Sequence, residues 1–150
     1  MKQVTAFFLM LFLSITSTLS IAESFFPIQP AHTGSWFDPD DPGFGGFINV
    51  ADVNGARVIV ISWFDLDRDG EQFWLVGSSA PIERGVGSVI IPMFQEREEF
   101  GKRKSFKWGT FTIEITSCDT LRIFGNPKEE NVGGGWVNLT RLTKIEGMSC

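Results

Sequence analysis

The chain has 150 residues, and its 13 Lys and Arg residues against 18 Asp and Glu residues give a formal net charge of −5. This length accommodates one domain with a substantial hydrophobic core, but not two. The acidic balance, without a basic stripe that could neutralise phosphates, argues against nucleic acid as a partner.

Residues 1–22 have the layout of a secretory signal peptide. Lys2 precedes an apolar run over residues 6–13, and the segment ends in the small-residue stretch Ser20-Ile21-Ala22. The apolar run is too short for a membrane span, which needs about 20 predominantly apolar residues. We therefore expect cleavage after Ala22, a secreted or periplasmic protein, and no membrane span after cleavage.

Residues 23–33 contain two prolines and no apolar periodicity, and we expect an extended lead-in there. From residue 34 onward, short β-branched and aromatic runs alternate with glycine-rich turns. Residues 92–104 are the only stretch in which a helix longer than two turns could form, and we expect residues 96–107, of mixed charge, to be a solvated loop. Residues 34–150 are thus predicted to be one all-β domain, an antiparallel up-and-down β-barrel of about eight strands, with a two-sheet β-sandwich as the alternative.

Asn54-Gly55 marks the best-specified hairpin, because both central residues of a two-residue type I′ turn need a positive φ. Accepting this turn fixes the register of the two strands. Ile48 then faces Ile61, and Val50 faces Ile59, so the apolar side chains share one face of the pleat.

The same register sets Trp63 opposite Gly46, where a large ring can lie over a residue that has no side chain. The strand then continues into residues 67–70, which predict a tight turn closed by a glycine in the left-handed region. Such a turn leaves Trp63 beside Leu75 or Val76 on the following strand.

Asp65, Asp67, Asp69 and Gly70 also occupy positions 1, 3, 5 and 6 of a calcium-binding loop. The twelfth position, which needs a bidentate Glu, holds Val76, and the flanking segments are predicted strands rather than helices. Calcium stays open as an alternative, but we favour a hairpin turn without a metal.

No pattern of a catalytic site stands out. The only histidine, His32, lies in the lead-in, and no GxSxG elbow presents a serine. The acids at positions 38, 40, 41 and 65 could form a carboxylate pair, although turn-forming or surface roles are favoured. We expect no catalytic residue and no cofactor, with a carboxylate-dependent secreted hydrolase as the alternative.

Cys118 and Cys150 are the only cysteines. An exported chain with an even number of cysteines usually oxidises them, so we expect one disulfide bond between these two. No histidine or third thiol lies near either of them in the sequence, which argues against a metal or redox role.

Aromatic residues are unusually abundant, with five Trp and 15 Phe but no Tyr. The segment "SWF" occurs twice, starting at Ser35 and at Ser62. A strand followed by a turn favours these residue types, so the similarity does not require an internal duplication of the chain. Because neighbouring strand residues face opposite sides, the Trp and Phe of "SWF" and "QFW" cannot both point inward. Some rings therefore stay outside the core, and rings that share a concavity would form an apolar or sugar-stacking platform.

Gly34-Ser35-Trp36 and the Arg141 of "NLTRL" resemble the GxW motif and the terminal-strand Arg of lipocalin-like (calycin) barrels. This resemblance implies that the Trp plugs one barrel end and that the Arg packs across it in a cation–π contact. Across residues 34–150, "GSWFDPDDPGFGGFINV", "WFDLDRDGEQFWL" and "GGWVNLTRL" are similar to a domain of exported bacterial proteins, found alone or appended to secreted enzymes. In that pattern an aromatic residue usually follows the second glycine of GxG, whereas here Gly45 is followed by Gly46 and then Phe47. The extra residue moves the ring to the opposite face of the strand.

These observations favour an exported, non-catalytic binding module. An aromatic-lined barrel mouth or outer face would take a small apolar ligand, a glycan or a protein. A structural or inhibitor protein of the envelope is a further alternative. The predicted ligand-binding residues are Trp36, Trp63, Trp74, Trp136 and Arg141.

Overall fold

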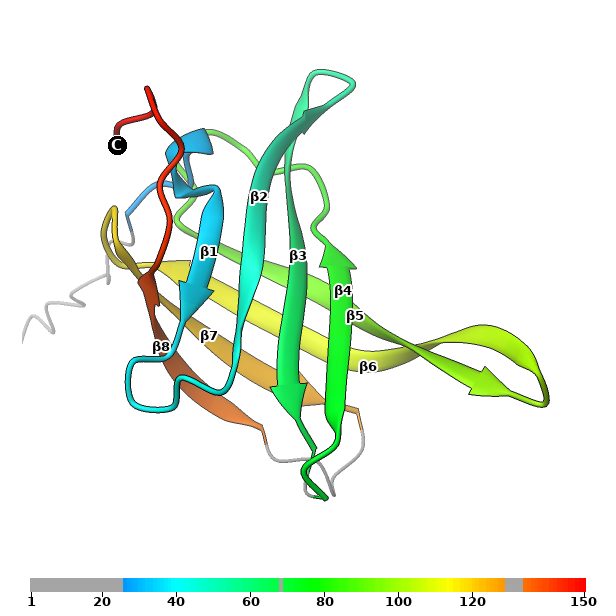
Figure 1. Cartoon of the computed structure of the whole chain (residues 1–150). Helices are drawn as coiled ribbons and strands as arrows, with labels where there is room; N and C mark the ends of the chain where they lie inside the picture. Colours follow the sequence, from blue (N-terminus) through cyan, green and yellow to red (C-terminus); the bar gives the residue numbers. More distant parts are fainter. Residues whose placement is uncertain (1–25, 68, 129–133) are drawn as a thin grey trace, which may run out of the picture.

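The structure is a computed structural model that describes residues 26–67, 69–128 and 134–150. Eight antiparallel strands follow one another around a closed barrel, and the last strand pairs with the first (Figure 1). The strands are β1 (Gly34–Phe37), β2 (Gly45–Val53), β3 (Ala56–Leu66), β4 (Gln72–Ser78), β5 (Ser88–Glu99), β6 (Lys102–Ile115), β7 (Thr120–Pro127) and β8 (Gly135–Arg141). The predicted antiparallel all-β architecture is confirmed, with one ring-like sheet in place of the alternative sandwich.

The lead-in packs across one end of the barrel, which we call the closed end. The backbone amides of Phe26 and Ile28 donate hydrogen bonds to the end of β6 and to the loop before β5, and Pro30–His32 form a single 3-10 helix. Ile28 is buried in the core. The predicted signal peptide, residues 1–22, lies outside the described residues; within them, no helix is long and apolar enough to cross a membrane.

The β2–β3 hairpin has the predicted turn and register. Asn54-Gly55 has φ values of 55° and 82°, as a type I′ turn requires. Ile48 pairs with Ile61, and Val50 pairs with Ile59. All four side chains are buried, so this hairpin turns one continuous apolar face toward the barrel interior.

Two consecutive glycines leave room for rings on both sides of β2. Gly46 pairs with Trp36 of β1 and with Trp63 of β3, and both indoles are buried. Gly45 is flanked in the same way by the Phe residues of the two "SWF" segments. A methyl group at position 46 would lie 2.7 Å from the carbonyl oxygen of Ser62, closer than atoms can approach. The two "SWF" segments are thus neighbours of a single glycine pair.

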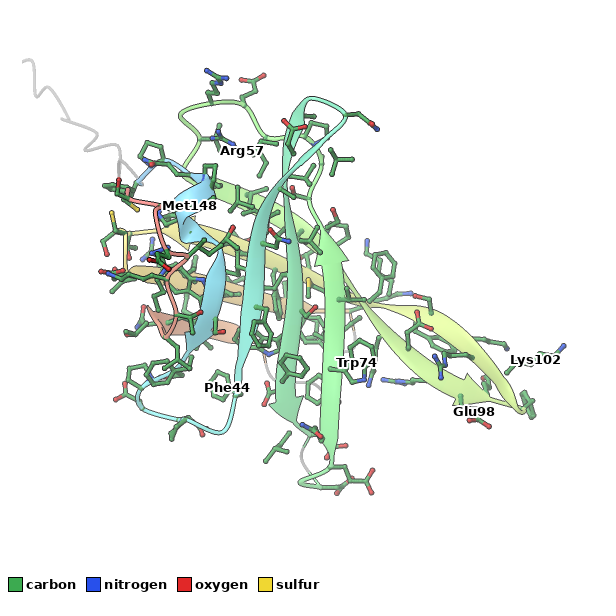
Figure 2. All side chains as sticks on the ribbon, turned by 45° about the horizontal axis from the view of Figure 1, so that its top comes forward. Phe44, Arg57, Trp74, Glu98, Lys102 and Met148 are labelled. Atoms are coloured by element: carbon green, nitrogen blue, oxygen red, sulfur yellow. The ribbon has the colours of Figure 1, made fainter. Side chains whose placement is uncertain are left out.

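Residues 96–107 do not form the expected loop. Together with the preceding part of β5, they build a long hairpin that projects beyond the barrel as a twisted arm (Figure 1). Opposite charges face each other across its strands, as in the pair Glu98 and Arg103, and such pairs favour strand pairing without an apolar pattern. Its turn is Phe100-Gly101, with φ values of 53° and 70°, and Figure 2 shows Glu98 and Lys102 near this tip. The loop prediction was therefore wrong, and the stretch holds no helix.

Aliphatic side chains fill the middle of the barrel. They come from seven strands, and together they are Ile48, Val50, Ile59, Ile61, Leu75, Ile91, Met93, Ile113, Ile115, Leu121, Ile123 and Leu139. This packed layer separates the closed end from the opposite end, the mouth, where β1 turns into β2 and β3 turns into β4.

Gly46→Ala should destabilise the fold by about 1–3 kcal/mol, because the added methyl forces Ser62 or the Trp63 ring to move in a packed core. Gly135→Ala is the matched control, since a Cβ there meets nothing within 4 Å, and it should change stability by less than about 0.5 kcal/mol. Urea unfolding of both variants measures the difference. Equal effects of the two substitutions would contradict the role given to Gly46.

Candidate ligand-binding site

A cavity of about 640 Å³ lies at the mouth of the barrel. Rings and aliphatic side chains form most of its wall, and a few polar side chains stand among them. The apolar side chains of the lining are Phe44, Trp63, Leu66, Phe73, Leu75, Trp108, Phe111, Ile123, Trp136 and Val137, and the charged or amide side chains are Asp65, Asp67, Asp69, Gln95 and Arg97. This composition is typical of small-molecule binding sites.

Four rings make one continuous aromatic wall. The ring centroid of Trp63 lies 5.6 Å from that of Phe44 and 5.3 Å from that of Phe111. Phe111 in turn contacts Trp108 at 5.4 Å, and both contacts of Phe111 are edge-to-face, a geometry that ring quadrupoles favour. Phe44 comes from the loop before β2 (Figure 2). The wall is therefore held by contacts between rings from three separate segments.

Trp108 reaches the cavity because of a β-bulge in β6. Gly109 and Lys107 pair with consecutive residues of β5, which leaves Trp108 without a partner. The extra residue shifts the alternation, so Trp108 and Phe111 face the same side although they are three positions apart. A Cβ at Gly109 would lie 2.2 Å from a carbonyl oxygen of β7, so the bulge requires glycine at this position.

Asp65 brings a carboxylate to the wall of this apolar cavity. It follows Trp63 by two residues on β3 and accepts a hydrogen bond of 2.7 Å from the amide of Leu66 and one of 3.4 Å from Trp63 Nε1. Burial raises the pKa of Asp65, and the charge of Asp41 raises it further, whereas both hydrogen bonds lower it. A carboxyl group with a raised pKa in a cleft is a candidate functional group.

Asp67 and Asp69 belong to the turn between β3 and β4. The Asp67 carbonyl accepts a 3.0 Å hydrogen bond from Gly70, which has a φ of 80°. The Asp67 Oδ1 accepts hydrogen bonds of 3.0 Å and 2.9 Å from the amides of Asp69 and Glu71. The predicted hairpin turn is confirmed. In the part of the chain that the structure describes, no three His, Cys, Asp or Glu side chains are grouped to hold a metal ion.

Arg97 is the one basic side chain among the described residues of the cavity wall. Its Nε donates a 2.8 Å hydrogen bond to Gln95 Oε1, and its guanidinium carbon lies 5.9 Å from the centre of the Phe106 ring. These contacts direct Arg97 along the projecting arm.

Trp36 and Arg141 lie across each other at the closed end, as the calycin resemblance implies. The guanidinium carbon of Arg141 is 5.4 Å from the centre of the Trp36 ring, and Trp36 Nε1 donates a 3.1 Å hydrogen bond to the His32 carbonyl. The Arg141 Nη1 lies 3.6 Å from Asp119 Oδ1. Burial, followed by the charge of Arg141, lowers the pKa of His32. These residues plug the barrel and do not line the cavity.

Trp74 and Trp136 face outward. Their side chains are 50% and 49% exposed, because their strand neighbours face the interior. The ring of Trp136 packs against Phe124 with centroids 5.2 Å apart, and Figure 2 shows Trp74 on β4. Of the five predicted site residues, Trp63 and Trp136 border the cavity, whereas Trp36, Trp74 and Arg141 do not.

Cys118 and Cys150 lie side by side, but both are free thiols. The two cysteines lie 2.7 Å apart, but the disulfide bond predicted between them is not formed. The Cys150 sulfur also lies 3.5 Å from His32 Nε2. Burial and the hydrogen bond with the Cys118 thiol raise the pKa of Cys150 to about 11, so this thiol is protonated at neutral pH.

No protein-family model matches the chain, and no curated protein is significantly similar to it. The function is therefore inferred from the geometry of the cavity. Sequence reasoning named Trp63 as a site residue but did not place Phe44 or Trp108 in the site, because a loop ring and a bulged residue follow no strand periodicity.

Asp65→Asn should raise the melting temperature at pH 7. Folding raises the pKa of Asp65 above its value in the unfolded chain. The contribution of this group to stability is therefore fully present at a pH below the unfolded pKa, and it is lost as the pH rises through the folded pKa and the buried carboxyl group ionises. The uncharged amide avoids that loss. The gain should shrink toward zero near pH 3, below the ordinary Asp pKa of about 3.9.

Thermal melts at both pH values measure this difference, and Glu83→Gln, which removes an exposed charge from the β4–β5 loop, is the control. An Asp65→Asn variant that melts below the wild type at pH 7 would show that the carboxylate stabilises the fold.

Proposed function

We propose that this chain is an exported, non-catalytic binding protein that takes a small, largely apolar ligand into the cavity at the barrel mouth. The observation that carries this proposal is the division of the barrel into two unlike ends. The lead-in, Trp36 and Arg141 fill the closed end, whereas the mouth keeps a cavity with an aromatic wall.

The size and lining of the cavity support a small organic ligand. Its volume of about 640 Å³ falls in the range of roughly 300–1,000 Å³ that is usual for such sites. The wall is mainly apolar, so a ligand that enters it gains about 25 cal/mol for each Å² of apolar surface removed from water. The rings are fixed by their mutual contacts, so little order has to be created on binding.

Two of the acids considered for catalysis, Asp38 and Asp41, shape the loop between β1 and β2. Asp38 Oδ1 accepts a 2.8 Å hydrogen bond from the amide of Asp40, and Asp41 Oδ1 accepts one of 3.3 Å from Gly43. These contacts are those of turn-forming aspartates. They support a structural role for Asp38 and Asp41, whereas Asp65 lines the cavity, where a carboxylate-dependent hydrolase would need it.

The uncharged fluorescent probe N-phenyl-1-naphthylamine should bind with micromolar affinity and gain fluorescence. Gly125→Leu should weaken this binding at least tenfold, because a Cβ at Gly125 lies 3.5 Å from the Trp108 ring and the rest of the leucine side chain would occupy space in the cavity. A circular dichroism spectrum and a thermal melt establish that this variant is folded. Asn138→Leu, which adds leucine to the exposed face of β8, is the matched control. Fluorescence titration gives the three dissociation constants.

Two results would contradict the proposal. The first is that the probe does not bind to the folded wild type at all. The second is that binding survives Gly125→Leu but disappears in Trp74→Ala, which would place the ligand on the outer face of β4.

Export would place Cys118 and Cys150 in an oxidising compartment, and we propose that they then form a disulfide bond. Their contact supports this pairing, since little backbone movement is needed to bring the sulfurs together. Protein recovered from a periplasmic or secreted fraction should show no free thiol after denaturation, and two after reduction. Two reactive thiols before reduction would contradict both the bond and the oxidising location.

A further inference from the structure

We propose that the cavity selects amphipathic cations, meaning ligands with an apolar body and a protonated amine, and that Asp65 receives the amine. This inference rests on the proposed function of the cavity and adds the chemical class of its ligand.

The position of Asp65 fits a head-group receptor. Asp65 pairs with Phe73 across β3 and β4, and both residues line the cavity. Its neighbour on the same face of β3 is Trp63, whose ring belongs to the aromatic wall. A ligand whose body lies on the rings therefore brings its polar end toward this carboxylate.

The Asp65 carboxylate has acceptor capacity to spare. An ionised carboxylate offers about four lone pairs. Asp65 uses one for the 2.7 Å hydrogen bond from Leu66 and one for the weaker 3.4 Å contact with Trp63 Nε1. By contrast, the Asp67 Oδ1 already accepts two backbone amides within its turn, so Asp65 is the better acceptor for a ligand N–H.

The charges around Asp65 favour a cation. Asp67 and Asp69 also line the cavity, and Asp41 is close enough to affect the protonation of Asp65. The one basic side chain among the described wall residues, Arg97, is engaged by Gln95 and lies over the Phe106 ring on the arm. An anionic head would meet repulsion at this wall, whereas a cation would be attracted.

The aromatic wall strengthens this preference. A cation close to the face of a Trp or Phe ring is attracted by the ring quadrupole. The Trp63 indole contacts the Asp65 carboxylate, and Phe44 and Trp108 add rings to the same cavity wall. In addition, burial makes the ionised form of Asp65 less favourable, and a bound cation would offset that penalty. A neutral ligand would leave it in place.

Decylamine, decanol and decanoate test the inference, because they share one alkyl chain and differ in the charge of the head. Each displaces N-phenyl-1-naphthylamine from the full chain at pH 7, below its micelle concentration. We expect decylamine to bind about tenfold more tightly than decanol, and decanol more tightly than decanoate. In Asp65→Asn the ratio of decylamine to decanol affinity should fall toward one, and in Glu83→Gln it should stay at the wild-type value.

The outcomes separate the inference from the proposed function. Equal affinities for the three compounds, or tightest binding of decanoate, would overturn the cation preference while leaving a ligand-binding cavity. An amine preference that persists in Asp65→Asn would overturn the role of Asp65. Failure of every compound and of the uncharged probe to bind would instead overturn the proposed function. Displacement that is lost in Gly125→Leu shows that the compounds compete within the cavity.

Discussion

The architecture depends on Gly46, which lies in β2 between two tryptophans of the adjacent strands. A side chain at this position would collide with the backbone of β3 and with the Trp63 ring, so only glycine lets both indoles turn inward at this level of the barrel. Because β1 and β3 both run antiparallel to β2, their "SWF" segments meet the same glycine pair from either side. The sequence echo therefore has a packing explanation that requires no duplication.

The two indoles placed in this way serve opposite ends of the barrel. Trp36 is held by the His32 carbonyl and covered by Arg141, and so it completes the plug. Trp63 contacts Phe44 and Phe111 and forms part of the cavity wall. The aliphatic side chains pack with both indoles in one core. A barrel with one closed end and one ring-lined open end can hold a small ligand without letting it pass through. The Asp65 carboxylate, whose ionised form is disfavoured by burial, lies at the open end.

Local signals in the sequence were enough for the architecture. The Asn54-Gly55 turn set a register that the structure reproduces, and alternation required some rings to stay outside the core without identifying which ones. Two features of the structure were not predicted from the sequence, because neither gives a periodic pattern of apolar residues. The charged arm pairs through cross-strand charges, and Trp108 enters the cavity through a bulge that shifts the alternation by one residue. The site was only half foreseen for the same reason: strand periodicity identified Trp63, whereas the cavity is completed by a loop residue and a bulged residue.

The five tryptophans offer a direct measurement of where a ligand binds, because each indole N–H gives its own signal in a ¹H–¹⁵N NMR spectrum. Addition of N-phenyl-1-naphthylamine should shift the indole signals of Trp63 and Trp108 and leave those of Trp36 and Trp74 in place. Shifts confined to Trp74, or to Trp36 at the closed end, would contradict a binding cavity at the barrel mouth.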